Sequence, residues 1–165
     1  MIYFLLRDVS KQASNMRVVI QRVSQASVSI DGQVKAEIKH GLLLLVGFEE
    51  SDTEKDLQWT SAKVAALRIF NDESGLMNKS VRDVDGSILL VSQFTLFASC
   101  KKGNRPSFIR AAKPDTAIPL YEQFITLLEK ETCRKIETGT FGADMKVSLI
   151  NDGPFTITID SKMPE

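Results

Sequence analysis

The first part of the chain alternates between apolar and polar positions in short runs, which predicts β-structure. Residues 17–23 read as a strand, and residues 26–30 alternate up to Asp31-Gly32, a dipeptide typical of a two-residue hairpin turn. A second alternating run follows this turn. Residues 42–46 are then continuously apolar, which indicates a strand buried on both faces. We expect three or four strands before the first helix.

Two later segments have the periodicity of amphipathic helices. Ser51, Asp52 and Thr53 offer N-cap residues for a helix that runs to about residue 69. A second helix begins at Asp115 and ends near Arg134. The expected core-facing positions are Leu57, Val64 and Leu67 in the first helix and Ile118, Tyr121, Phe124, Ile125 and Leu128 in the second.

Strand patterns return around the second helix. Residues 87–97 read as a strand with an apolar centre, and residues 146–150 and 155–159 read as two strands joined by a turn. Strands come first, helices are inserted, and strands come last. This order predicts an α+β fold with a largely antiparallel, barrel-like sheet and two inserted amphipathic helices.

The first fifteen residues differ from the rest of the chain. Their apolar run, residues 2–6, is shorter than the roughly 7–15 residues of a signal-peptide core, and no run is long enough to span a membrane. The strand pattern begins directly after Met16. We therefore expect a flexible leader or extension at residues 1–15, whose role stays open, and a single domain at residues 16–165 with no membrane contact.

Composition narrows the possible chemistry. The 165 residues contain 21 Lys plus Arg and 21 Asp plus Glu, so no global positive field favours general nucleic-acid binding, and we expect no DNA partner. Cys100 and Cys133 match neither a zinc spacing nor a disulfide scaffold, which favours reduced thiols in a cytoplasmic protein. We expect no metal.

The only histidine, His40, precedes Gly41 at a predicted turn. Triads and dyads built on histidine need an imidazole beside a nucleophile, and they could be formed here only by recruiting His40. If the chain is an enzyme, we expect water, the backbone or the substrate to carry its proton transfers.

Polar residues interrupt the strand pattern of residues 87–97 in the motif SQFTLFA. Its candidate catalytic residues are Ser92, Gln93, Phe94 and Thr95. One interpretation is that these polar groups only satisfy neighbouring backbone. The other is that backbone N–H groups at the strand end form an oxyanion-hole-like donor set, where Thr95 positions or attacks an ester.

A second motif, NDGPFT, occupies residues 151–156. Glycine reaches backbone angles closed to other residues, and an X-Pro bond is the usual place for a cis peptide. The motif is either an ordinary turn between two strands or a rigid backbone element whose carbonyls read the shape of a ligand.

Together the two motifs resemble the D-aminoacyl-tRNA deacylase (D-tyrosyl-tRNA(Tyr) deacylase) family, proofreading enzymes that hydrolyse D-amino acids from mischarged tRNA. Residues 16–23, 67–75, 103–108 and 138–143 resemble the family's landmarks in the family's order, so the resemblance covers residues 16 to about 161. The visible departure is Phe155, where valine is frequent.

The resemblance implies a homodimer without metal or organic cofactor. Gly153-Pro154, with a cis peptide, would enter the partner's active site and exclude L-side chains by collision. Arg22 and Asn151 would support this turn. Glycine could also enter, so glycyl-tRNA mischarged on tRNA-Ala is a further candidate substrate.

Two mechanisms stay open for ester hydrolysis. Thr95 could be a nucleophile, although the chain offers it no convincing base. Alternatively, as the resemblance favours, the 2′-hydroxyl of the terminal adenosine assists, and main-chain N–H groups around Phe94 and Thr95 stabilise the oxyanion. Asp152 could act as a base, but a turn-forming aspartate is the simpler interpretation.

Residues 101–113, which follow the catalytic motif, contain five Lys or Arg residues and no Asp or Glu. Solvation explains such a run, but phosphates of a tRNA acceptor end would also need partners here. Two alternative functions stay open: a non-catalytic RNA-binding module, and a deacylase that removes a small L-amino acid and carries a different Gly-Pro peptide geometry. The candidate tRNA-binding residues are Lys101, Lys102, Arg105, Arg110 and Lys113.

Overall fold

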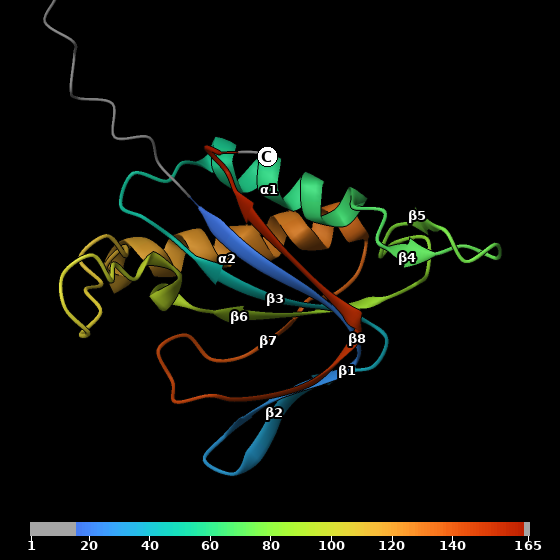
Figure 1. Ribbon diagram of the computed structural model, residues 1–165, viewed down its shortest axis with the longest axis horizontal. Helices are drawn as coiled ribbons and strands as arrows, with labels where there is room; N and C mark the ends of the chain where they lie inside the picture. The colour runs from blue at the N-terminus through green and yellow to red at the C-terminus, as the bar shows by residue number, and fades with distance from the viewer. Residues whose placement is uncertain (1–15, 164–165) are drawn as a thin grey trace, which may run out of the picture.

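A computed structural model describes residues 16–163 as a strongly curved sheet with helices α1 and α2 packed side by side against one face (Figure 1). The predicted leader at residues 1–15 lies outside the described residues. The elements are β1 (Arg17–Ile30), β2 (Gln33–Ile38), β3 (Gly41–Gly47), α1 (Glu54–Ala66), β4 (Phe70–Asn71), β5 (Met77–Lys79), β6 (Ser87–Ser92), the 3₁₀ helix η1 (Phe94–Phe97), α2 (Pro114–Thr132), β7 (Glu137–Thr138) and β8 (Lys146–Asp160).

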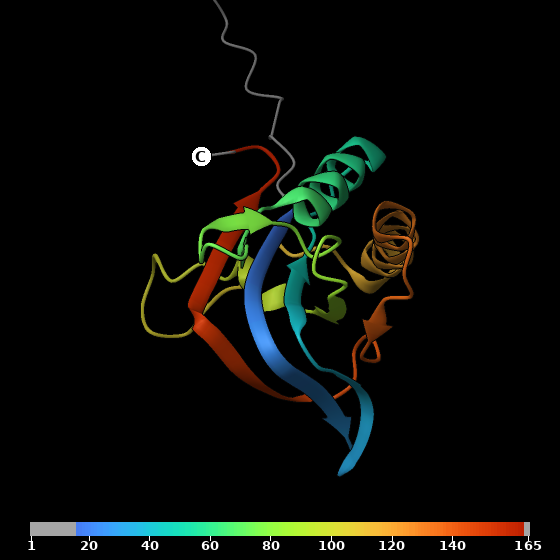
Figure 2. The same ribbon diagram turned by 90° about the vertical axis from the view of Figure 1, so that its right-hand side faces the viewer.

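The main sheet has the order β2-β1-β3-β6-β7, and β8 pairs with the other edge of β1. The end strands β2 and β7 approach each other, so the sheet curls into a nearly closed barrel (Figure 2). Strand β1 is antiparallel to β2, β3 and β8, whereas β3–β6 and β6–β7 are parallel. The α+β fold is confirmed, but the sheet is mixed, because the crossover through α1 returns the chain in the direction of β3.

Strand β3 is buried on both faces, as its continuous apolar run predicts. Leu42, Leu44 and Val46 belong to the core cluster that contains the buried residues of the helices. Leu43 belongs to a second cluster on the opposite face, together with buried residues of β1, β2 and β6. The β1–β2 hairpin also forms as predicted, with positive φ at Asp31 (50°) and Gly32 (78°), the pattern of a type I′ turn.

The prediction of a strand over residues 87–97 is wrong beyond Ser92. The chain turns there into η1, and this turn buries the ring of Phe97 completely. An extended chain would alternate side chains between two faces, whereas η1 turns the chain back so that the Phe97 ring is buried beside Gly47 at the end of β3. The change from strand to 3₁₀ helix therefore places residues 93–97 around the end of β6.

The two strands predicted at the C-terminus are one strand, β8, with an irregularity in its middle. Gln21 pairs with Thr156 and Val23 pairs with Asn151. Only Arg22 stands between these partners on β1, so residues 152–155 are extruded from the ladder. The Gly-Pro motif is thus a bulge in a long edge strand and not a hairpin connection.

The helices differ from their predicted limits in detail. Helix α1 ends at Ala66, which leaves Leu67 as its C-cap. In α2, Ile118 is 38% exposed, and Ala117 is buried in its place. The buried face set by Tyr121, Phe124 and Leu128 continues four residues back from Tyr121, which gives position 117.

Candidate active site

A cavity of about 250 Å³ opens where β3 and β6 end. Its floor comes from the ends of these strands and its sides from η1, the start of α2 and the loop before β8. The predicted residues Ser92, Gln93 and Phe94 line it, whereas Thr95 does not. The complete lining is Val46, Gly47, Phe48, Val91, Ser92, Gln93, Phe94, Ala112, Ala117, Phe141, Gly142, Ala143, Asp144, Met145 and Val147.

Backbone donors are available at this end of β6. The N–H of Gln93 donates to the carbonyl of Val46 at 2.6 Å and so continues the β3–β6 pairing. The N–H groups of Phe94 and Thr95 open η1 and have no intrahelical acceptor. None of residues 16–163 accepts a hydrogen bond from them. Two neighbouring donors of this kind can stabilise an oxygen that becomes negative during ester hydrolysis.

The hydroxyl of Thr95 accepts a hydrogen bond from the side-chain amide of Gln93. Within residues 16–163, no carboxylate or imidazole accepts the Thr95 proton. His40 precedes the opposite end of β3, where its ring packs against Phe70 with the ring centroids 5.0 Å apart. Thr95 is therefore not part of a side-chain triad among the described residues.

The Gly153-Pro154 bulge lies away from the cavity of its own chain. Its peptide bond is cis, φ of Gly153 is +141°, and both residues are exposed. Arg22, opposite the bulge, pairs with Leu42, whereas the cavity lies near Val46. Leu42 and Val46 are four residues apart on β3, which corresponds to about 13 Å along the strand. The bulge also lies on the side of β1 that faces away from β3. The structure thus does not bring the two motifs together within one chain.

Arg22 and Asn151 hold the bulge from two sides. The Arg22 Nε donates to the carbonyl of Asp152 at 2.9 Å, and its Nη1 donates to the carbonyl of Ile69 at 2.7 Å. The Asn151 side-chain oxygen accepts the N–H of Phe155 at 2.7 Å. Asp152 lies 3.5 Å from Arg22 as an exposed ion pair, which fits a turn-supporting aspartate.

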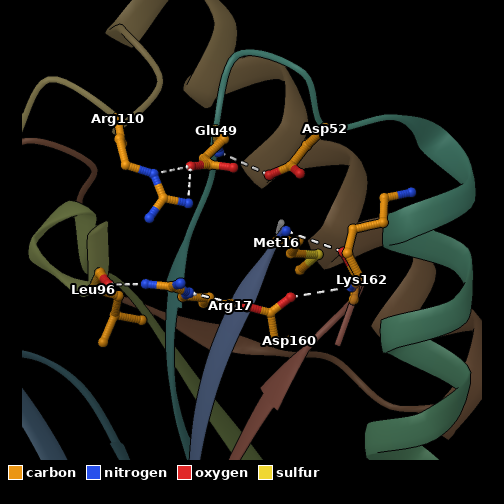
Figure 3. A network of polar contacts seen from close by, with 9 residues as sticks. Met16, Arg17, Glu49, Asp52, Leu96, Arg110, Asp160 and Lys162 are labelled. Carbon is orange, nitrogen blue, oxygen red and sulfur yellow. Dashed lines mark hydrogen bonds and ion pairs between the residues drawn. The ribbon is translucent and has the colours of Figure 1, made fainter. Parts of the chain in front are cut away.

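A polar network links η1 and the loop before α2 to β1, to β8 and to the segment after β3 (Figure 3). Arg17 donates to the carbonyl of Leu96 in η1 at 2.9 Å and pairs with Asp160 at 3.1 Å. Glu49, just after β3, accepts from Arg110 at 2.6 Å, and its N–H donates to Asp52 at 2.8 Å. Burial raises the pKa of Asp52 to about 7. These contacts tie η1 and the loop before α2 to the strands.

The five predicted cations do not form one uniform patch. Lys101, Lys102 and Arg105 are exposed and form no ion pair with any residue of the described range 16–163. Arg110 is engaged by the buried carboxylate of Glu49. Lys113 is the N-cap of α2, and its N–H donates to Glu50 at 2.7 Å, which with the Thr116 hydroxyl lowers the pKa of Glu50.

Sequence reasoning missed the wall of the cavity formed by residues 141–147. Phe141 and Met145 supply most of its apolar bulk, and Asp144 and Ala143 lie between them. The glycines of residues 138–142 were a visible signal of a shaped loop, but nothing in the sequence placed this loop opposite η1. Its position follows from the short parallel pairing of β7 with β6.

The described residues 16–163 contain no cluster of three His, Cys, Asp or Glu side chains arranged to hold a metal ion. Cys100 and Cys133 are free and exposed. No helix within the same range is long and apolar enough to cross a membrane.

Comparison with known proteins places this geometry in context. The family model described as D-Tyr-tRNA(Tyr) deacylase matches residues 19–160. A D-aminoacyl-tRNA deacylase of Flavobacterium johnsoniae is 63% identical over 150 residues, which are 91% of this chain and 100% of that protein. A D-aminoacyl-tRNA deacylase of Bacteroides thetaiotaomicron is 59% identical with the same coverage.

Two solved structures share the fold. A protein described as c-Myc DNA Unwinding Element Binding Protein superposes with a TM-score of 0.81 at 41% identity and covers 87% of this chain and 97% of its own. A probable eukaryotic D-amino acid tRNA deacylase superposes with a TM-score of 0.77 and covers 88% of this chain and 99% of its own. Its sequence is only 18% identical, so it shows the fold alone.

Proposed function

The chain belongs to the D-Tyr-tRNA(Tyr) deacylase family and is a D-aminoacyl-tRNA deacylase, an ester hydrolase; on this premise we propose where and how it acts. The substrate ester binds in the cavity at the ends of β3 and β6. The observation that carries the proposal is a pair of neighbouring N–H groups, of the cavity-lining Phe94 and of Thr95, that donate to no acceptor among the described residues. The enzyme acts in the cytoplasm as a homodimer, with the 3′ acceptor end of tRNA as its partner.

The proposed chemical step uses the substrate's own hydroxyl group. The ester carbonyl oxygen lies toward the N–H groups of Phe94 and Thr95, which stabilise it as it becomes negative. The 2′-hydroxyl of the terminal adenosine assists the attack of water on the carbonyl carbon. The bond from this carbon to the 3′-oxygen then breaks, and the 3′-oxygen takes up the proton that the water loses, which releases the D-amino acid and the tRNA. Thr95 shapes the pocket together with Gln93. Among residues 16–163 no carboxylate or imidazole accepts the proton of the Thr95 hydroxyl, which supports this role over a nucleophilic one.

The proposed chiral filter is the Gly153-Pro154 bulge of the partner subunit. Its exposure and its separation from the cavity of its own chain support this assignment. The backbone of the bulge would face the α-carbon of the aminoacyl group and collide with an L-side chain. Glycine has no side chain to reject, so glycyl-tRNA mischarged on tRNA-Ala is a proposed second substrate.

The test is hydrolysis of D-tyrosyl-tRNA and L-tyrosyl-tRNA by the purified protein. We expect kcat/KM to be about 100-fold or more higher for the D-substrate, because only the L-side chain meets the bulge. Equal rates would contradict the chiral filter. Tight tRNA binding without hydrolysis would favour the non-catalytic RNA-binding module, and preferential hydrolysis of a small L-aminoacyl-tRNA would favour the second alternative.

Substituting Thr95 with alanine separates the two mechanisms. We expect kcat for D-tyrosyl-tRNA to fall by about 10-fold or less, since the backbone donors remain and only the pocket is altered. Thr95→Ser, which keeps the hydroxyl, is the matched control. A loss of about 10⁴-fold in the alanine variant, with activity kept in the serine variant, would instead assign Thr95 as the nucleophile.

A further inference from the structure

Two phenylalanine rings, one of which lines the cavity, pack against each other and are partly open to solvent. Phe94 lines the cavity and is 56% exposed, and Phe108 is 37% exposed. Their ring centroids are 5.2 Å apart and their planes are 74° from parallel. In such a T-shaped pair the ring that presents its edge keeps both of its faces uncovered by its partner. An aromatic face is thus available immediately outside the cavity.

Phe108 is held in place by the contacts of its loop. This loop, residues 99–113, is drawn in yellow at the left of Figure 1. Ser99 and Ser107 exchange two backbone hydrogen bonds, at 2.8 and 3.0 Å. After Phe108, Arg110 pairs with Glu49, and the N–H of Ala112 donates to the carbonyl of Phe48 at 2.8 Å. The position of the ring relative to the cavity is therefore set on both sides.

The same loop supplies positive charge. Its outer part carries Lys101, Lys102 and Arg105, which are exposed and form no ion pair with residues 16–163. Unpaired cations beside an exposed aromatic face are the combination with which proteins bind single-stranded nucleic acid. An apolar protein partner would not need these cations, and a phosphate alone would not need the rings.

We propose that Phe94 and Phe108 form a stacking platform for the unpaired base that precedes the terminal adenosine of the tRNA 3′ end. The inference rests on the proposed function, which places the terminal nucleotide in the cavity. The next base then emerges at the mouth, where the two rings lie, and its phosphates pass along Lys101, Lys102 and Arg105. Phe108 is accordingly a positioning residue that acts on the polynucleotide and not on the ester.

The test compares D-tyrosyl-tRNA with a minimal substrate that keeps the aminoacylated terminal adenosine and lacks the rest of the tRNA. For Phe108→Leu we expect KM for D-tyrosyl-tRNA to rise about 10-fold with little change in kcat, since an aromatic face is lost while apolar bulk is kept. With 3′-(D-tyrosyl)adenosine, which lacks the preceding base, kcat/KM should stay within about 2-fold of the parent. Phe108→Tyr, which keeps the ring, should restore the parent KM.

Two further measurements separate base stacking by Phe108 from phosphate binding and from effects on hydrolysis. Lys102→Gln should weaken tRNA binding and flatten its salt dependence, whereas Phe108→Leu should leave the salt dependence unchanged. Binding of two ligands without an amino acid tests the platform without hydrolysis: an oligonucleotide that ends in CCA, and adenosine alone. The Phe108→Leu variant should lose affinity for the oligonucleotide only. Equal losses on both hydrolytic substrates, or no loss on either, would overturn the platform. Failure of the parent protein to hydrolyse either substrate would overturn the proposed function, and unchanged affinity of the Phe108→Leu variant for the CCA oligonucleotide would then overturn the platform as well.

Discussion

Replacing Gly153 with alanine is expected to lower kcat/KM for D-tyrosyl-tRNA by about 100-fold or more, because an error of about 1 Å in a positioning group has an effect of this size. The φ angle of +141° is one that residues with a side chain rarely adopt. An added Cβ would also lie 3.1 Å from the backbone nitrogen of Phe155 and 3.2 Å from Nη2 of Arg22. The bulge would have to move, and with it the backbone that we propose as the chiral filter.

The matched control for Gly153→Ala is Gly32→Ala. Gly32 also has a positive φ, of +78°, but nothing lies within 4 Å of its added Cβ. Both variants should show a similar small decrease in Tm, since each forces one residue into an unfavourable backbone conformation. Only Gly153→Ala should lose hydrolysis, measured as release of D-tyrosine. Parent-like activity in Gly153→Ala would remove the bulge from the site.

The second large effect is expected from Arg22→Ala. The guanidinium holds the carbonyls of Asp152 and Ile69 at 2.9 and 2.7 Å and lies over the Phe155 ring, 5.3 Å from its centroid. Loss of these contacts should lower kcat/KM for D-tyrosyl-tRNA by roughly 10- to 100-fold and reduce the preference for the D-substrate, since the bulge loses its orientation. Both effects would be measured from initial rates on the D- and L-substrates.

Two other substitutions define the cause of that loss. Arg22→Lys should recover only part of the activity, because one ammonium group cannot reach both carbonyls in the fixed fork geometry of a guanidinium. Gln21→Ala is the neighbouring control, since the Gln21 side chain reaches β8 through one 3.3 Å hydrogen bond to the Thr156 hydroxyl and lies outside the bulge. If Gln21→Ala loses as much activity as Arg22→Ala, general weakening of the β1–β8 pairing is the cause.

Much of the fold could be predicted because local patterns determine it. The continuous apolar run at residues 42–46 identified a strand with core on both sides, and Asp31-Gly32 identified the hairpin. The mixed character of the sheet could not be read, because strand direction depends on the crossover and not on the pattern of one strand. The turn into η1 was missed for a related reason: only the tertiary core shows that Phe97 must fold back.

In the candidate site, too, the features set by local sequence could be predicted, and those set by tertiary contacts could not. The sequence predicts a site at SQFTLFA because polar groups at the end of a buried strand need partners, and the N–H groups of Phe94 and Thr95 donate to none of residues 16–163. Arg110 stays a predicted tRNA-binding residue, but its ion pair with Glu49 could not be predicted, because Glu49 is distant in sequence and buried. The residues opposite η1 were missed because their approach depends on the pairing of β7 with β6.

The bulge in β8 and the cavity are fixed to the same rigid ladder of strands at levels about 13 Å apart. No bending of one chain can close this gap without breaking the β1–β3 pairing that forms the core. Under the proposed arrangement, a lone copy would hold a cavity unable to tell enantiomers apart and a bulge with nothing to read. Chirality would then be measured only by the assembled pair, and the fidelity of the enzyme would depend on its concentration in the cell.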